Sequence, residues 1–155
     1  MGPNPTDRGE PGTKQSLLVE GDGGPLAVTI AGANVPDFKP LDETIGAVVV
    51  ERPDPEDIEQ HLCLDAGYDN GPTREAVEGR GYIGHIRPAR EGPRPERRPG
   101  RRKARRWVVE RTLGWLSKCR ALRVRYDERD ENDLGLIQLA CGLLWYRRLY
   151  RLNAA

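Results

Sequence analysis

The sequence contains few of the residues that form disulfide frameworks and structural metal sites. Its 155 residues include three cysteines, Cys63, Cys119 and Cys141, with no C-x-x-C pair among them, and two histidines, His61 and His85. A structural zinc site takes about four closely spaced cysteine or histidine ligands, and a disulfide framework takes an even number of cysteines. We therefore expect neither feature, and we expect reduced thiols in a cytoplasmic protein.

Long apolar runs are also missing. The N-terminus lacks the apolar stretch of a signal peptide. The run at 134–146 has thirteen residues and ends at Arg147 and Arg148, whereas a membrane-spanning helix needs about 20 apolar residues. We interpret this run as a buried helix in a protein with no membrane partner. The hydrophobic fraction of 37% and the mean hydropathy of −0.70 predict a small core.

The net charge of +1 is the sum of two unlike halves. Residues 1–72 contain 14 acidic and 4 basic residues, whereas residues 73–155 contain 10 acidic and 21 basic residues. The stretch from Arg74 to Arg125 has 17 bases and 5 acids, and its centre is a Pro- and Arg-rich segment at about 87–103. Solvated basic loops are common, but this density of arginine favours contact with a nucleic-acid backbone.

The pattern of apolar residues and turn signals predicts an α/β fold. Two strands joined by Asp22-Gly23-Gly24 should form an antiparallel hairpin, and a later strand–helix–strand unit should pair in parallel. We expect the first dozen residues to be irregular and Asp37 to cap a helix. The predicted strands are 13–20, 25–31, 61–64 and 82–86, and the predicted helices are 38 to about 50, 72–79, 104–122 and 132–152.

Asp65 is the first candidate for chemistry. It directly follows the short apolar strand 61–64 and precedes Ala66-Gly67. This position is the carboxyl edge of a sheet, where the sites of α/β proteins gather. Alternatively, Asp65 is an ordinary turn or cap residue.

Glu110 is the second candidate. On a helix it shares one face with Trp107, Arg111, Gly114 and Lys118, while the remaining positions form a broad apolar stripe that should pack on the sheet. One interpretation is an exposed helix with ion pairs along its surface. The other is a carboxylate that holds a metal ion while its basic neighbours bind phosphates.

Several segments of the chain resemble bacterial insertion-sequence transposases of the DDE superfamily, in the branch grouped as IS-five-like. These segments are TDRGEPGTKQSLLVEGDGGPLAVTIAGAN, HLCLDAGYDN, GYIGHIRP, ARRWVVERTLGWLSKCRALRVRYD and LGLIQLACGLLWYRRLYRL. The likeness covers nearly the whole chain. It is most specific in the WVVER…WLSKCRAL segment and the LDxGYD turn.

The resemblance implies a ribonuclease-H-like fold in which three acids coordinate two Mg²⁺ (or Mn²⁺) ions for in-line displacement at phosphodiesters. By matching motifs, Asp65 is the second acid and Glu110 the third. Three residues separate Arg106 from the glutamate, as in the Tyr-Arg-Glu-Lys signature of the family. The chain departs from that signature in having Lys103 at the tyrosine position, and Ser117 at the lysine position with Lys118 next to it.

The first aspartate of the family lies on a strand upstream of the residues that begin this chain. The resemblance therefore implies a single truncated catalytic domain over 1–155, whose mixed sheet is flanked by helices and lacks its first strand, and which is inactive alone. A non-catalytic DNA-binding regulator and a decayed remnant are the alternatives.

The partners implied are double-stranded DNA (inverted-repeat ends and target) and either an upstream transposase segment or further copies of the chain, in the nucleoid. No organic cofactor is expected. The side chains expected to contact DNA are Lys14, Arg101, Arg102, Lys103, Arg105, Arg106, Arg111 and Lys118.

Overall fold

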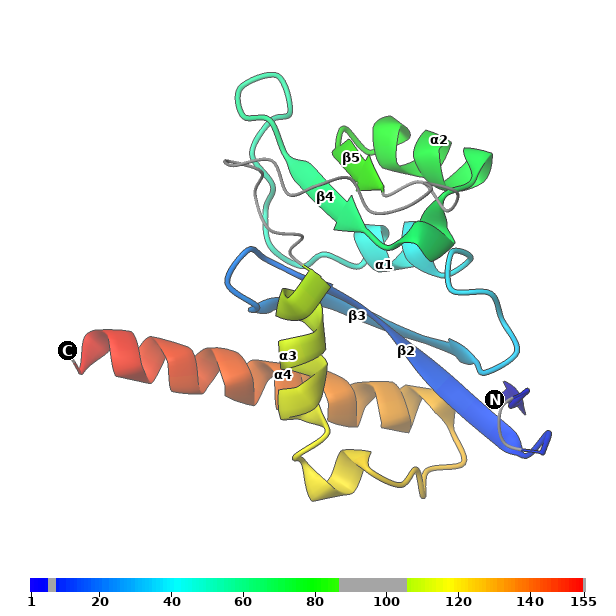
Figure 1. Cartoon of the computed structure of the whole chain (residues 1–155). Coiled ribbons are helices and arrows are strands. Elements are labelled where there is room, and N and C mark those ends of the chain that lie inside the picture. Colours follow the sequence, from blue (N-terminus) through cyan, green and yellow to red (C-terminus); the bar gives the residue numbers. More distant parts are fainter. Residues whose placement is uncertain (6–7, 87–105, 155) are drawn as a thin grey trace, which may run out of the picture.

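The computed structural model describes residues 1–5, 8–86 and 106–154, with Arg106 described by its backbone alone. A hairpin lies in the middle of the molecule, with α3 and α4 packed on it and a second sheet with α2 on its other side (Figure 1). The elements are β1 (Gly2–Pro3), β2 (Pro11–Val19), β3 (Pro25–Gly32), α1 (Leu41–Gly46), β4 (His61–Leu64), the 3₁₀ helix η1 (Ala66–Tyr68), α2 (Gly71–Gly79), β5 (Ile83–Ile86), α3 (Arg106–Leu116), the 3₁₀ helix η2 (Arg120–Leu122) and α4 (Asp130–Asn153).

The predicted hairpin is confirmed. Strands β2 and β3 pair antiparallel from Thr13 opposite Gly32 to Val19 opposite Pro25, with an irregularity between Leu18 and Val19. Gly23 adopts φ +92° in the turn, a conformation that glycine reaches without steric cost. The short strand β1 adds to β2 at residues 11 and 12. This strand was not predicted, because two residues are too few to show the alternation of apolar and polar residues that indicates a strand.

The predicted strand–helix–strand unit is also confirmed. Strands β4 and β5 pair in parallel, with His61 opposite Ile83 and Leu64 opposite Ile86. Helix α2 connects them, and the Asn70 side chain caps it by accepting a hydrogen bond from the Thr73 N–H at 2.9 Å. Pro72 stands in the first turn, where its missing N–H has no intrahelical partner to lose.

The helix predicted from 38 to about 50 is shorter than expected, and its predicted cap is wrong. Pro40 precedes α1, and a proline disfavours helical geometry at the residue before it. The Asp37 carboxylate instead pairs with Lys14 Nζ at 2.8 Å. The helix ends at Gly46, shortly before three consecutive valines, whose β-branched side chains are poor helix formers.

The helix predicted over 104–122 also ends early. Helix α3 stops at Leu116, and the Ser117 hydroxyl donates to the Gly114 carbonyl at 2.9 Å, a local bond that competes with helix continuation. Helix α4 begins two residues before the predicted start. Its first turn carries Asp130, Glu131 and Asp133, which suit the positive end of a helix dipole.

Two apolar clusters pack against the hairpin formed by β2 and β3. The first joins Val28 to Leu116 of α3 and to Ile137, Ala140 and Cys141 of α4. The second consists of Leu41, Ile45, Leu62 and Val77, with Leu18 of β2 against it. Neither cluster is large, as the composition predicts, and no helix in the described ranges is long and apolar enough to cross a membrane.

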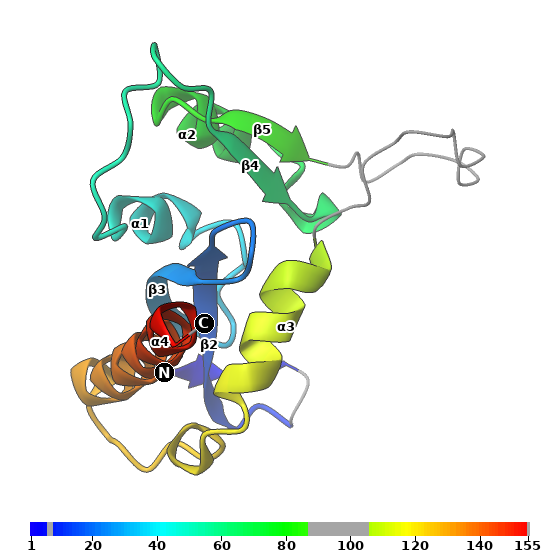
Figure 2. The same cartoon turned by 90° about the vertical axis from the view of Figure 1, so that its left-hand side faces the viewer.

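The α/β class is confirmed, but the expected single mixed sheet is present as two sheets. Among the described residues the hydrogen-bonded strand orders are β1-β2-β3 and β4-β5. The hairpin and the parallel pair are therefore connected by side-chain packing and not by a strand ladder. In Figure 2 the two sheets lie one above the other, with α1 beside them.

Candidate functional site

Asp65 lies at the carboxyl end of β4, as predicted. Its backbone is extended, with φ −74° and ψ 165°, and its Oδ1 accepts a hydrogen bond from the Ala66 N–H at 2.7 Å. The side chain is exposed and caps η1. The capping role of Asp65 is thus present.

Glu110 lies on the exposed side of α3, close to its N-terminal end. Both views place this end of the helix toward the layer that contains β4 and η1 (Figures 1 and 2). Across the described parts of the chain, no group of three or more histidine, cysteine, aspartate or glutamate side chains is arranged to hold a metal ion. Asp65 and Glu110 therefore offer carboxylates without a complete ligand set among these residues.

The apolar stripe of α3 is narrower than predicted. Val108, Thr112 and Leu116 are buried, with Thr112 fully inaccessible, whereas Leu113 and Trp115 are 37% and 40% exposed. The three buried positions are four residues apart, so the helix contacts the hairpin along a single line of side chains. Glu110, two positions after Val108, falls on the outer side.

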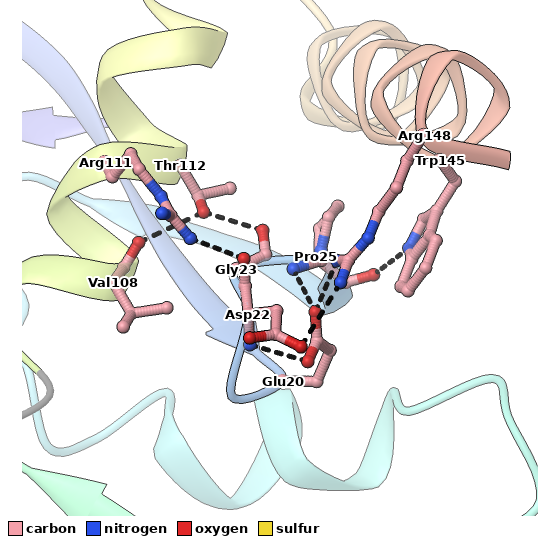
Figure 3. Close-up of polar contacts among 10 residues, drawn as sticks. Glu20, Asp22, Gly23, Pro25, Val108, Arg111, Thr112, Trp145 and Arg148 are labelled. Carbon is pink, nitrogen blue, oxygen red and sulfur yellow. Dashed lines mark hydrogen bonds and ion pairs between the residues drawn. The ribbon is translucent and has the colours of Figure 1, made fainter. Parts of the chain in front are cut away.

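The turn between β2 and β3 is held from both sides by polar side chains of α3 and α4. We call these four side chains, together with Glu20 at the start of the turn, the turn clamp: Glu20, Arg111, Thr112, Trp145 and Arg148 (Figure 3). From α3, the Thr112 hydroxyl donates to the Gly23 carbonyl at 2.7 Å, and the Arg111 guanidinium donates to the Asp22 carbonyl. From α4, the Trp145 indole N–H donates to the Pro25 carbonyl at 2.7 Å.

Glu20 is the acidic centre of the turn clamp. Its carboxylate accepts hydrogen bonds from the Asp22 and Gly24 N–H groups, each at 2.7 Å, and pairs with Arg148 at 2.6 Å. Burial alone raises the pKa of Glu20, but the two backbone hydrogen bonds and the Arg148 guanidinium together outweigh it, and the pKa is lowered from its ordinary value. The ionised form therefore stabilises the turn.

The turn clamp fixes how α3 lies on the hairpin. Because Thr112 is fully buried and bonded to Gly23, α3 cannot rotate about its axis without leaving a buried carbonyl unpaired. Glu110 is two residues away on the same helix. The clamp thus sets the direction in which Glu110 projects.

Sequence reasoning missed the turn clamp. It placed Thr112 correctly in the buried stripe but assigned it no polar partner. Arg148 and Glu20 are separated by 128 residues, and neither belongs to a recognisable motif. The only available signal was an arginine just after the apolar run at 134–146, which does not identify its acidic partner.

Three of the side chains expected to contact DNA have described surroundings. Arg111 stacks over Trp107 and Trp115, at 4.6 and 5.1 Å from the ring centroids, in addition to its bond to the turn. Lys14 pairs with Asp37, and Lys118 is exposed just beyond α3. Their contact with DNA remains a prediction. The side chains of Arg101, Arg102, Lys103, Arg105 and Arg106 lie outside the described residues.

Comparison with known proteins gives one family and one relative. Residues 2–145 match the family described as transposase DDE domain. A Burkholderia cepacia protein named "Putative transposase for insertion sequence element IS402" is 37% identical over 153 residues, which are 97% of this chain and 70% of that protein. No solved structure matches. The match over most of its length shows that this chain belongs to the transposase DDE domain family.

Proposed function

We propose that this chain is the C-terminal part of a transposase catalytic domain, which binds transposon ends and cuts and joins phosphodiesters when a further acid is supplied. The observation that carries the proposal is the family match over residues 2–145 together with an exposed aspartate at the end of β4. Glu110 on α3 is the second proposed ligand. The carboxyl end of a strand is where α/β enzymes place their catalytic groups.

The donor chemistry of the two acids fits the metal that the family generally uses. Carboxylate oxygens are the ligands that Mg²⁺ and Mn²⁺ prefer, and Asp65 and Glu110 would hold such an ion. When bound, a divalent ion activates the attacking oxygen and stabilises the leaving one. The protein's own part is to keep Glu110 directed outward through the turn clamp, and to keep Asp65 at the end of a hydrogen-bonded strand.

The two separate sheets support the idea that a strand is missing between them. In the described parts of the chain, β2 pairs with β3 along its length and with β1 only at its first two residues, and β4 pairs with β5 alone. Each therefore has an edge without a strand partner among the described residues, and proteins ordinarily cover such edges. We propose that a strand bearing the first acid pairs with both edges and completes one ribonuclease-H-like mixed sheet around residues 1–155.

The basic segment is the proposed DNA-binding element. Double-stranded DNA is recognised first through its phosphates, and each neutralised phosphate releases counterions. The arginines and lysines at 101–106, with Lys118 exposed at the end of α3, are the proposed contacts.

The test is cleavage of DNA by a fusion. The chain is joined to the part of the Burkholderia relative that the match does not cover, and Mg²⁺-dependent nicking of inverted-repeat ends is measured. We expect the fusion to cut and the chain alone to cut little or nothing. Asp65→Asn and Glu110→Gln should each reduce cleavage at least about a hundredfold while DNA binding persists. A fusion that does not cut, or one that cuts equally well without either carboxylate, would overturn the proposal.

A non-catalytic DNA-binding regulator is the second candidate, and the incomplete ligand set among the described residues favours it. Such a protein would compete with full-length transposase for its ends. It predicts binding to end DNA that is unchanged by Asp65→Asn and independent of Mg²⁺, with no cleavage by the fusion.

A further inference from the structure

A pair of histidines lies on the face of the β4–β5 sheet opposite α2. On the other face, Leu62 is buried and Val77 of α2 packs close to Gly84. Because side chains alternate along a strand, His61 and His85 point away from α2. His61 Nδ1 lies 3.0 Å from His85 Nε2, and the ring centroids are 5.0 Å apart with planes tilted by 42°.

We propose that His61 and His85 bind a divalent transition-metal ion of the kind that prefers imidazole, such as Ni²⁺, Cu²⁺ or Zn²⁺. Two metal–nitrogen bonds of about 2.1 Å meeting at a right angle span about 3.0 Å. The two nitrogens therefore already have the separation of neighbouring ligands on one ion. Only the direction of the rings has to adjust, and the His61 side chain is 48% exposed.

Glu59 supports the same assignment. Its Oε2 lies 3.8 Å from Nε2 of His61, the ring nitrogen that faces away from His85. Histidine ligands commonly direct their second N–H to a carboxylate, which leaves the other nitrogen for the metal. Without metal, one ring N–H lies between His61 and His85. An ion would take the place of that proton, and His85 would carry its proton on Nδ1.

This site is distinct from the carboxylate site proposed above, and it does not depend on that proposal. Asp65 is four residues further along the chain, which is roughly 13 Å for an extended strand. Its oxygen ligands suit hard ions, whereas imidazoles suit transition metals. Because the described residues contain no group of three potential ligands, water would occupy the remaining positions on the ion.

The ion would join two strands that are otherwise held by one short parallel ladder. Strand β4 leads directly to Asp65, and β5 is its only described partner strand. A ligand that binds the folded protein and not the unfolded chain raises stability. Bound metal should therefore stabilise this sheet.

The test uses the complete chain, freed of metal with a chelator and titrated with Ni²⁺ in a calorimeter at pH 8. We expect one ion per chain, with binding weakened about a hundredfold by either His61→Asn or His85→Asn, because each removes half of a chelating pair. Glu59→Gln should weaken binding by about tenfold. Two controls should bind Ni²⁺ as the parent does: Cys63→Ser, which changes the exposed thiol opposite His85, and the double variant Asp65→Asn, Glu110→Gln.

Thermal unfolding gives a second readout. Ni²⁺ should raise the Tm of the parent and of both controls but not of the histidine variants, and His61→Gln and His85→Gln repeat the test with a different side chain. The proposal is overturned if the parent binds no Ni²⁺, or if binding survives both histidine changes. Loss of binding in the Asp65, Glu110 double variant would assign the ion to the carboxylate site instead.

Discussion

The turn clamp and the exposed face of the β4–β5 sheet are organised in opposite ways. In the clamp, five side chains from three distant parts of the sequence satisfy the carbonyls and N–H groups of one turn, and Thr112 is fully buried. On the face of β4–β5 opposite α2, Cys63, His61 and His85 are exposed. Hydrogen bonds that hold buried backbone groups from several sides resist change, whereas an exposed set of ligating side chains remains available to bind something.

The same contrast applies to the two proposed metal ligands. Glu110 projects from α3, and the clamp determines the position of this helix on the hairpin. No additional segment of chain is therefore needed to orient Glu110. Asp65 ends a strand with one described neighbour in its sheet. We infer that the half of the site on α3 is preformed and that the half on β4 is completed by an additional strand.

The largest expected difference is in thiol reactivity, between the α4 core next to the clamp and the β4–β5 face. Burial raises the pKa of Cys141, with a smaller contribution from nearby Cys119, whereas Cys63 is exposed on β4. Labelling with a thiol reagent at pH 8 should modify Cys63 at least about a hundredfold faster, since Cys141 reacts only after a local opening of about 3 kcal/mol. Mass spectrometry of digested protein measures both rates, and Cys63→Ser identifies the fast site. Equal rates would mean that the core around α4 is not closed.

The next effect concerns the hydroxyl within the clamp. Thr112→Val keeps the shape of the side chain but leaves the buried Gly23 carbonyl without its partner, which should cost about 2 kcal/mol of unfolding free energy. Ser117→Ala is the matched control, because it removes an exposed hydroxyl bond to the Gly114 carbonyl and should cost less than about 0.5 kcal/mol. Urea denaturation measures both. A similar loss for the two variants would contradict the role assigned to the clamp.

A smaller effect is expected at Glu20. Its pKa is lowered in the folded protein, so its contribution to stability is present above the pKa of the unfolded chain and is lost as the pH falls through the lowered value. Glu20→Gln should cost about 1 kcal/mol at pH 7, since the pair with Arg148 is partly exposed to solvent. The difference between parent and variant should shrink on acidification from pH 6 to pH 3. A difference that is constant over this range would show that the charge of Glu20 is not involved.

The smallest effect concerns DNA binding by single lysines. Lys118→Gln should weaken binding to any duplex and reduce the slope of log K against log salt by about 1. Lys14→Gln should change the slope less, because the Lys14 ammonium already pairs with Asp37. Fluorescence anisotropy at several salt concentrations compares the two. A larger change for Lys14 would indicate that this ion pair opens when DNA binds.

Local sequence patterns predicted most of the helices and strands, whereas contacts between residues far apart in the sequence were not predicted. The strand at 61–64, its parallel partner and the helix between them follow from short apolar runs and turn residues. The extent of α1 was overestimated because the valines after Gly46 continue the apolar pattern without favouring a helix.

The candidate site was predicted only in part, for the same reason. Asp65 is at the end of the strand, where the pattern of apolar residues put it, and Glu110 is on the outer face of its helix. The bond between Thr112 and Gly23 spans 89 residues, and the contact between His61 and His85 depends on the strand register. Neither a contact between residues so far apart in the sequence nor the register of a strand pair can be derived from a single sequence.

Amide hydrogen exchange tests the central claim, that an added strand completes the β4 half of the site while the α3 half is already formed. The chain alone and its fusion to the unmatched part of the relative are compared by mass spectrometry of peptides that cover β2, β4 and the turn at residues 20–25. We predict that exchange of β2 and β4 amides slows in the fusion, while exchange in the turn is slow in both proteins and unchanged. Unchanged exchange in β2 and β4, or slowing confined to the turn, would contradict the account.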